Sequence, residues 1–84
     1  MPELSRFYGI VIKMFFLKKE HNPPHIHAVY GDYIGALDIR TGEVMEGDLP
    51  AKAVAMVQEW ITLHKDELAQ IWETQNFRKL PPLE

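Results

Sequence analysis

The 84 residues are enough for one small domain with a single core, and their 46% hydrophobic and 25% charged content is that of a soluble globular protein. The absence of cysteine excludes disulfides and thiolate chemistry and fits a reducing cytoplasm. A formal net charge of -3 argues against a nucleic-acid binder that depends on general electrostatic attraction. Because the chain shows no signal-peptide pattern and no apolar run near ~18 residues, we expect a cytoplasmic protein with no membrane segment.

The stretch from Phe7 to Leu17 is rich in β-branched and aromatic residues, which predicts a first strand. Both of its alternating sets of side chains are apolar, whereas a strand with one wet face should alternate. This strand is therefore either central and covered twice, or one whose second face meets another chain. The pattern predicts an oligomer, most simply a two-fold homodimer.

A β-hairpin is predicted next, with strands over residues 25–30 and 33–39 joined by the two-residue turn Gly31-Asp32. Counting outward from this turn pairs Tyr30 with Tyr33, Val29 with Ile34, Ala28 with Gly35, His27 with Ala36, Ile26 with Leu37 and His25 with Asp38. One face of the hairpin is then apolar, and the other carries His25, His27 and Asp38.

After a turn at Thr41-Gly42, residues 43–45 predict a short fourth strand, and residues 47–50 predict the start of a helix. Asp48 or Leu49 is expected near the cap of this helix, with Pro50 in its first turn. The apolar residues that follow at helical spacing are Val54, Val57, Trp60, Ile61, Leu68, Ile71 and Trp72, and they extend the helix to about Thr74. A break within residues 63–67, with Asp66 capping a second helix, is the alternative.

These elements predict an α+β domain over residues 1–76, followed by a tail at 77–84 that lies on the surface or is frayed. Its fold is a small antiparallel meander of about four strands with one long C-terminal amphipathic helix packed on one face. A single helix leaves the second face of the sheet open, which again predicts association with another copy or a partner.

The most distinctive segment is His21-Asn22-Pro23-Pro24-His25-Ile26-His27, which holds three of the four histidines. The two prolines form a stiff, extended spacer between His21 and the strand that follows. His25 and His27 are two residues apart in that strand and so share a face. Asp38, opposite His25, would orient the imidazole and raise its pKa.

Three interpretations of these histidines stay open. His21, His25 and His27 can provide three ligands to a divalent transition metal such as zinc. Alternatively, His25, His27 and Asp38 form a catalytic acid–base group. In the third, the imidazoles only hydrogen-bond to the backbone.

Other candidate residues are better explained by structure than by function. His64 lies within the apolar stripe of the helix and joins the other histidines only if the helix covers their face. Trp60 and Trp72 are interpreted as core aromatics. The acidic residues Glu43, Glu46 and Asp48 are interpreted as a solvated turn.

With these residues in view, the chain resembles a bacterial family known as domain of unknown function 4160. The shared features are Pro2-Glu3, Ser5-Arg6-Phe7, Gly9-Ile10, His21-x-Pro23-Pro24-His25-x-His27, Tyr30, Asp38-Ile39, Thr41-Gly42-Glu43-Val44, Gly47-x-Leu49-Pro50, Glu59-Trp60, His64, Glu67-Leu68 and Trp72. The resemblance spans roughly residues 2–75. It implies a small protein without an assigned activity, whose gene often neighbours that of another uncharacterised family, domain of unknown function 2442, in a toxin–antitoxin-like arrangement. It also implies that His21, His25 and His27 are the main functional site, with Asp38 and His64 secondary.

Two functions follow as hypotheses. One is a component of a two-gene, toxin–antitoxin-like module that acts through protein–protein interaction, as a homodimer or with a small partner protein from the neighbouring gene. The other is a nuclease-like hydrolase that uses His25 and His27 as acid, base or metal ligands. The scarcity of basic residues near the histidines speaks against a nucleic-acid substrate.

Overall fold

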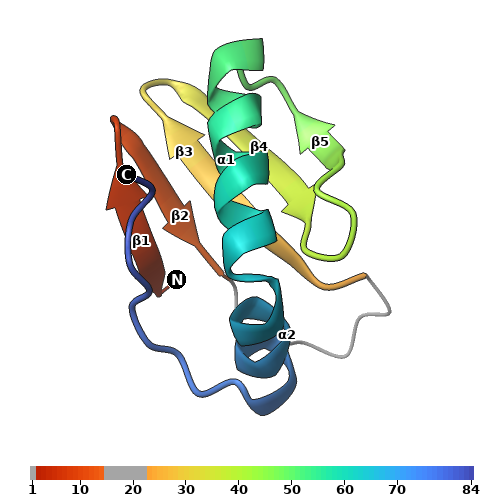
Figure 1. The fold of residues 1–84 in the computed structure, drawn as a ribbon. Coiled ribbons are helices and arrows are strands. Elements are labelled where there is room, and N and C mark those ends of the chain that lie inside the picture. The colour runs from red at the N-terminus through yellow and green to blue at the C-terminus, as the bar shows by residue number, and fades with distance from the viewer. Residues whose placement is uncertain (1, 15–22) are drawn as a thin grey trace.

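The fold, seen in a computed structural model that describes residues 2–14 and 23–84, is an antiparallel sheet with helices on one face (Figure 1). The elements of this part of the chain are β1 (Glu3–Phe7), β2 (Ile10–Lys13), β3 (His25–Tyr30), β4 (Tyr33–Asp38), β5 (Val44–Gly47), α1 (Ala51–Leu63) and α2 (Lys65–Thr74). The sheet order is β1-β2-β3-β4-β5, with every neighbouring pair antiparallel. The α+β class and the meander are therefore confirmed, but the described residues form five strands and two helices instead of about four strands and one helix.

The predicted strand from Phe7 to Leu17 is wrong, because a turn divides it. β1 ends at Phe7, Tyr8 and Gly9 turn the chain with positive φ angles of 49° and 82°, and β2 begins at Ile10. Positive φ is rare for a tyrosine, so the only turn signal in this run was Gly9, which adopts positive φ readily. Residues 15–17 of the predicted strand lie outside the described residues. The two apolar sets of side chains in the predicted strand are divided, in the described residues, between β1 and β2. The homodimer that they suggested stays a prediction.

The predicted hairpin and its pairing are confirmed, except that β4 ends at Asp38, one residue before the predicted end. β3 and β4 flank Gly31-Asp32, and all six predicted pairs occur, from Tyr30 opposite Tyr33 to His25 opposite Asp38. Ile26 and Leu37 are buried under the helices, since they belong to the core. The residues next to them, including His25 and His27, point to the opposite face of the sheet.

The connection from β5 into α1 differs from the prediction. β5 covers Val44–Gly47 instead of residues 43–45, and the N-cap of α1 is Pro50, not Asp48 or Leu49. Pro50 has an extended ψ of 147° and makes no side-chain cap hydrogen bond. A proline fits this position because the start of a helix needs no backbone N–H donor there.

The prediction of a single long helix is also wrong, because the helix is interrupted at His64. This residue has φ -118° and ψ 22°, outside helical values, and it serves as C-cap of α1 and N-cap of α2. The alternative of a break within residues 63–67 is correct, but the cap is His64, and Asp66 lies in the first turn of α2. Both helices bury one side against the same face of the sheet, through Val57, Trp60, Ile61, Leu68 and Ile71.

The C-terminal segment, residues 77–84, is packed against the domain. Leu80 and Leu83 are buried, and the backbone N–H of Leu80 donates to the carbonyl of Leu4 at 2.7 Å. The indole N–H of Trp60 donates to the carbonyl of Pro81 at 2.9 Å. Figure 1 shows this segment returning along β1. The segment thus covers one edge of the sheet and belongs to the core.

Neither helix of the described residues is long and apolar enough to span a membrane.

Candidate functional site

The candidate site lies on the sheet face that the helices leave open. Three rows of side chains cross this face from strand to strand: Arg6, Val11, Val29 and Ile34; Glu3, Lys13, His27, Ala36 and Glu46; and His25 with Asp38. The first row is apolar over its inner members and ends in Ile34, which is 57% exposed. In the second row, His27 lies between Lys13 on one side and, beyond Ala36, Glu46 on the other. Polar and apolar strips therefore lie side by side around the histidines.

His25 begins β3 and is held by its own backbone. Its ring nitrogen Nδ1 lies 2.9 Å from the carbonyl oxygen of Pro23, and since a carbonyl only accepts, Nδ1 carries the hydrogen. The neutral ring then has its lone pair on Nε2, the tautomer suited to accept a proton or bind a metal through that nitrogen. The Pro-Pro spacer thus presents the acceptor that orients His25.

Two aromatic rings pack around His25. The ring centroids of His25 and His27 are 5.2 Å apart at an interplanar angle of 66°, and those of His25 and Trp72 are also 5.2 Å apart. Trp72 belongs to α2 and is half-buried. The second helix therefore reaches the first histidine of the open face, although both helices pack on the other side of the sheet.

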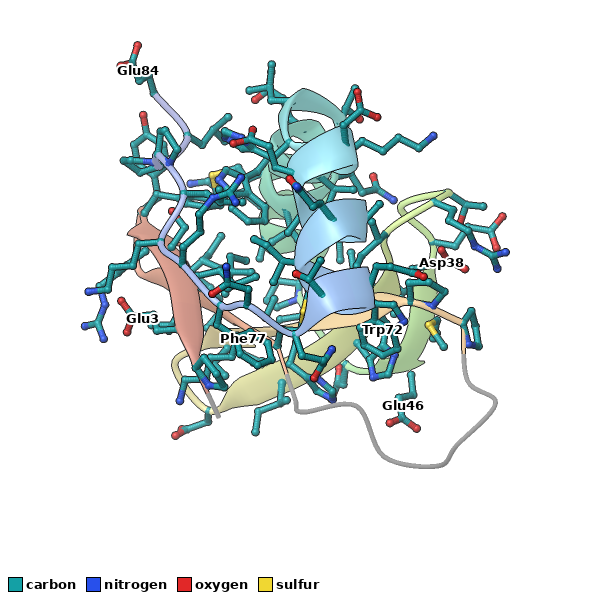
Figure 2. All side chains as sticks on the ribbon, turned by 90° about the horizontal axis from the view of Figure 1, so that it is seen from below. Glu3, Asp38, Glu46, Trp72, Phe77 and Glu84 are labelled. Carbon is teal, nitrogen blue, oxygen red and sulfur yellow. The ribbon has the colours of Figure 1, made fainter. Side chains whose placement is uncertain are left out.

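His27 has an altered protonation equilibrium. Burial lowers the pKa of His27 below its ordinary 6.5, the adjacent His25 lowers it further, and the Glu46 carboxylate acts in the opposite direction. These effects together favour the neutral form of His27. Figure 2 shows Glu46, Trp72 and Asp38 toward one side of the molecule, with Glu3 at the other.

Asp38 lies opposite His25, as predicted, but its carboxylate is engaged elsewhere. Oδ1 accepts the backbone N–H of Arg40 at 2.7 Å, and Oδ2 lies 3.4 Å from the Arg40 guanidinium. Burial acts to raise the pKa of Asp38, but hydrogen bonds from Arg40 and from the backbone N–H of Thr41 hold it below the usual value. Asp38 thus stabilises the turn after β4, while the carbonyl of Pro23 orients His25.

His64 lies away from this group. Its ring packs against Trp60 with centroids 5.1 Å apart, and its Nδ1 is 2.8 Å from Glu67 Oε1. Because it sits between the two helices, it lies on the side of the sheet opposite His25 and His27. The structure therefore brings together His25 and His27 and leaves His64 in a structural role at the helix break.

The predicted metal set cannot be followed to its third member, since His21 lies outside the described residues. Within residues 2–14 and 23–84, no three His, Cys, Asp or Glu side chains are grouped so that they could hold a metal ion. Zinc at His21, His25 and His27 stays a prediction.

Trp72 packs against the core, as the sequence predicted, and its ring also contacts His25. Glu46 is exposed, as predicted, but it lies in β5 and lines the hollow beside His27. For Glu46 the missing information is the register of β5, which shifts between Ala36 and Leu37 and so places Glu46 opposite Ala36. For Trp72 the missing information is the helix break at His64, which changes the direction of α2. Neither feature has a residue signal of its own.

A family model for a domain of unknown function, DUF4160, matches residues 9–73 of the chain. The match covers most of the domain, including the histidine segment, α1 and α2 as far as Glu73, and the chain belongs to this family. No curated protein matches the chain, and no solved structure does.

Proposed function

We propose that this protein is the interaction component of a two-gene, toxin–antitoxin-like module and that it binds its partner through the open sheet face around His25 and His27. The observation that carries the proposal is the composition of this face. It combines a row of apolar side chains ending in the exposed Ile34 with a row of polar ones through His27. Protein interfaces commonly pair an apolar centre with a polar rim.

The hollow beside His27 supports binding of a protein more than binding of a small molecule. It is lined by His27, Ile34, Gly35, Ala36, Glu46 and Gly47 and has a volume of about 190 Å³. Small-molecule sites usually enclose roughly 300–1,000 Å³. A hollow of this size instead suits the tip of a single side chain from a partner.

The test is co-purification with the product of the neighbouring gene, followed by titration of the two purified proteins. Ile34→Lys should raise the Kd by roughly tenfold or more, because it places a charge in the apolar row. Leu63→Lys is the matched control, since Leu63 is 64% exposed but lies at the end of α1. If the two variants bind with equal affinity, the partner does not bind through this face. If no complex forms at all, the proposed function is refuted.

A second candidate function is a nuclease-like hydrolase in which His25 and His27 transfer protons. One observation favours it: the Pro23 contact places the lone pair of His25 on Nε2, and the adjacent His27 has a lowered pKa that favours its neutral form. The pair offers an imidazole nitrogen, Nε2 of His25, that can accept a proton from a substrate or water. If His25→Ala and His27→Ala each keep the full cellular effect of the protein, the hydrolase is refuted.

A further inference from the structure

The two edges of the sheet are treated differently. At β1, the C-terminal segment donates a backbone hydrogen bond from Leu80 to Leu4 and buries Leu80 and Leu83. At β5, by contrast, all four residues are exposed, and the strand closes the sheet order with only β4 beside it among the described residues. One edge is covered by the chain itself, whereas within residues 2–14 and 23–84 the other edge has only β4 beside it.

The open edge has the properties of a site for an added strand. Ladder hydrogen bonds alternate along a strand, so the outer side of an edge strand presents backbone donors and acceptors that another strand can pair with. Val44 and Met45 are 40% and 41% exposed, which makes this edge apolar as well. Addition of an extended segment at such an edge is a common mode of peptide recognition.

The start of β5 is held in place before any partner arrives. The side-chain amide of Gln58, in α1, donates to the carbonyl of Gly42 at 2.9 Å. The carbonyl of Glu43 accepts the backbone N–H of Asp38, also at 2.9 Å. An edge that is already ordered loses less conformational entropy on binding.

The charges along this edge select the occupant. Glu43, Glu46 and Asp48 are acidic, and no lysine or arginine occurs from residue 41 to residue 51. The preceding Arg40 is within 3.4 Å of Asp38. Pairing β5 with β5 of a second copy would place these carboxylates near one another, which is unfavourable. A segment carrying lysine or arginine would instead be complementary.

We propose that β5 pairs with an extended, basic segment of the partner protein, which adds a sixth strand to the sheet. This inference rests on the proposed function and names the chemistry of the partner. The added segment alternates apolar residues, which contact Val44 and Met45, with lysine or arginine residues that face the acidic side chains.

The experiment measures the Kd of the complex with the product of the neighbouring gene for three forms of this protein. The edge variant carries Glu43→Gln, Glu46→Gln and Asp48→Asn, which remove charge without removing size. Its matched control carries Glu59→Gln, Glu73→Gln and Glu84→Gln, three exposed residues away from β5 that give the same change in net charge. Thermal unfolding verifies that both variants fold.

The edge variant should bind about tenfold or more weakly, the control variant within about twofold of the wild type, and the difference should shrink at ~1 M salt, where charge interactions are screened. Hydrogen exchange of the wild-type complex should show new protection of backbone amides in Val44–Gly47. A complex that forms without this protection and with equal affinity for both variants overturns the inference and leaves the proposed function standing. If none of the three forms of this protein forms a complex, the proposed function is overturned. If the protein instead self-associates through β5 as its concentration rises, the inference of a basic partner segment is overturned.

Discussion

Leu80→Ala is expected to destabilise the whole domain, although Leu80 lies only four residues from the C-terminal Glu84. The side chain is 5% exposed and belongs to the main core cluster, and its backbone is tied to Leu4 of β1. Leucine-to-alanine changes in a core cost about 2–5 kcal/mol, the transfer term plus the cavity left behind. A terminal segment can shift to fill part of the cavity, so the lower end of that range, about 2–3 kcal/mol, is expected.

That loss is large for a protein of this size. A domain of 84 residues has a total stability of roughly 4–12 kcal/mol. The melting temperature should fall by roughly 10–20 °C. Urea unfolding should show a lower midpoint with an unchanged slope, since the unfolded state is the same.

Two controls separate burial from a general effect of substitution. Lys79→Ala changes the exposed neighbour in the same segment, and Leu63→Ala removes an exposed leucine elsewhere. Both should stay within about 0.5 kcal/mol of the wild type. If Leu80→Ala also stays within that margin, the segment is not packed against β1 and the reasoning fails.

Three further perturbations test other parts of the structure. Since the folded-state pKa of His27 is lowered, the stability that depends on its neutral form is present above pH 6.5 and is lost as the pH falls below that value. His27→Gln should therefore make stability less sensitive to pH between 7 and 5, and an unchanged profile would refute this. Ser5 is buried, and its hydroxyl has no hydrogen-bond partner among the described residues. Ser5→Ala should therefore leave the free energy of unfolding unchanged or raise it by up to ~1 kcal/mol. A loss of more than ~1 kcal/mol would show that the hydroxyl is hydrogen-bonded. Gly47 has φ 101°, and a Cβ there would collide with the carbonyl oxygen of Ile34, so Gly47→Ala should cost at least ~2 kcal/mol. The control is Gly31→Ala, where φ is 60° and no atom lies near the added Cβ. This change should lower the free energy of unfolding by about 1 kcal/mol. Equal losses at the two positions would contradict the predicted collision at Gly47.

The hairpin was predictable because its information is local. Gly31 has φ 60°, a conformation that glycine adopts freely, and once the turn is placed the two-residue period of a strand determines every pair outward to His25 and Asp38. The shared face of His25 and His27 follows from the same counting. This part of the candidate site needed no tertiary structure.

The first strand could not be predicted correctly because its turn uses an unfavourable residue. Tyr8 adopts φ 49° and is followed by Gly9, inside a run whose composition is that of one continuous strand. Packing of β1 and β2 under the helices offsets the cost of that conformation, and packing is not visible in local composition.

The orientation of His25 was predicted with the wrong partner. Register places the Asp38 carboxylate opposite the imidazole, but a nearer backbone donor, the N–H of Arg40, binds it first. Side chains of aspartate commonly accept from the N–H two residues ahead, and such local bonds compete with cross-strand ones. His25 then takes the carbonyl of Pro23, two residues behind it.

By itself, the sequence determined the class of fold, the hairpin with its register, the placement of two histidines on one face and the membership of the family that the comparison confirms. These depend on periodicity, turn residues and motifs, which are properties of neighbouring residues. Only the tertiary structure decided that Trp72 and Glu46 join those histidines and that His64 lies on the other side of the sheet. It also decided that the C-terminal segment closes one edge, while no strand of the described residues pairs with the outer side of β5. Each of these depends on where distant segments pack, and packing free energy is shared over the whole core.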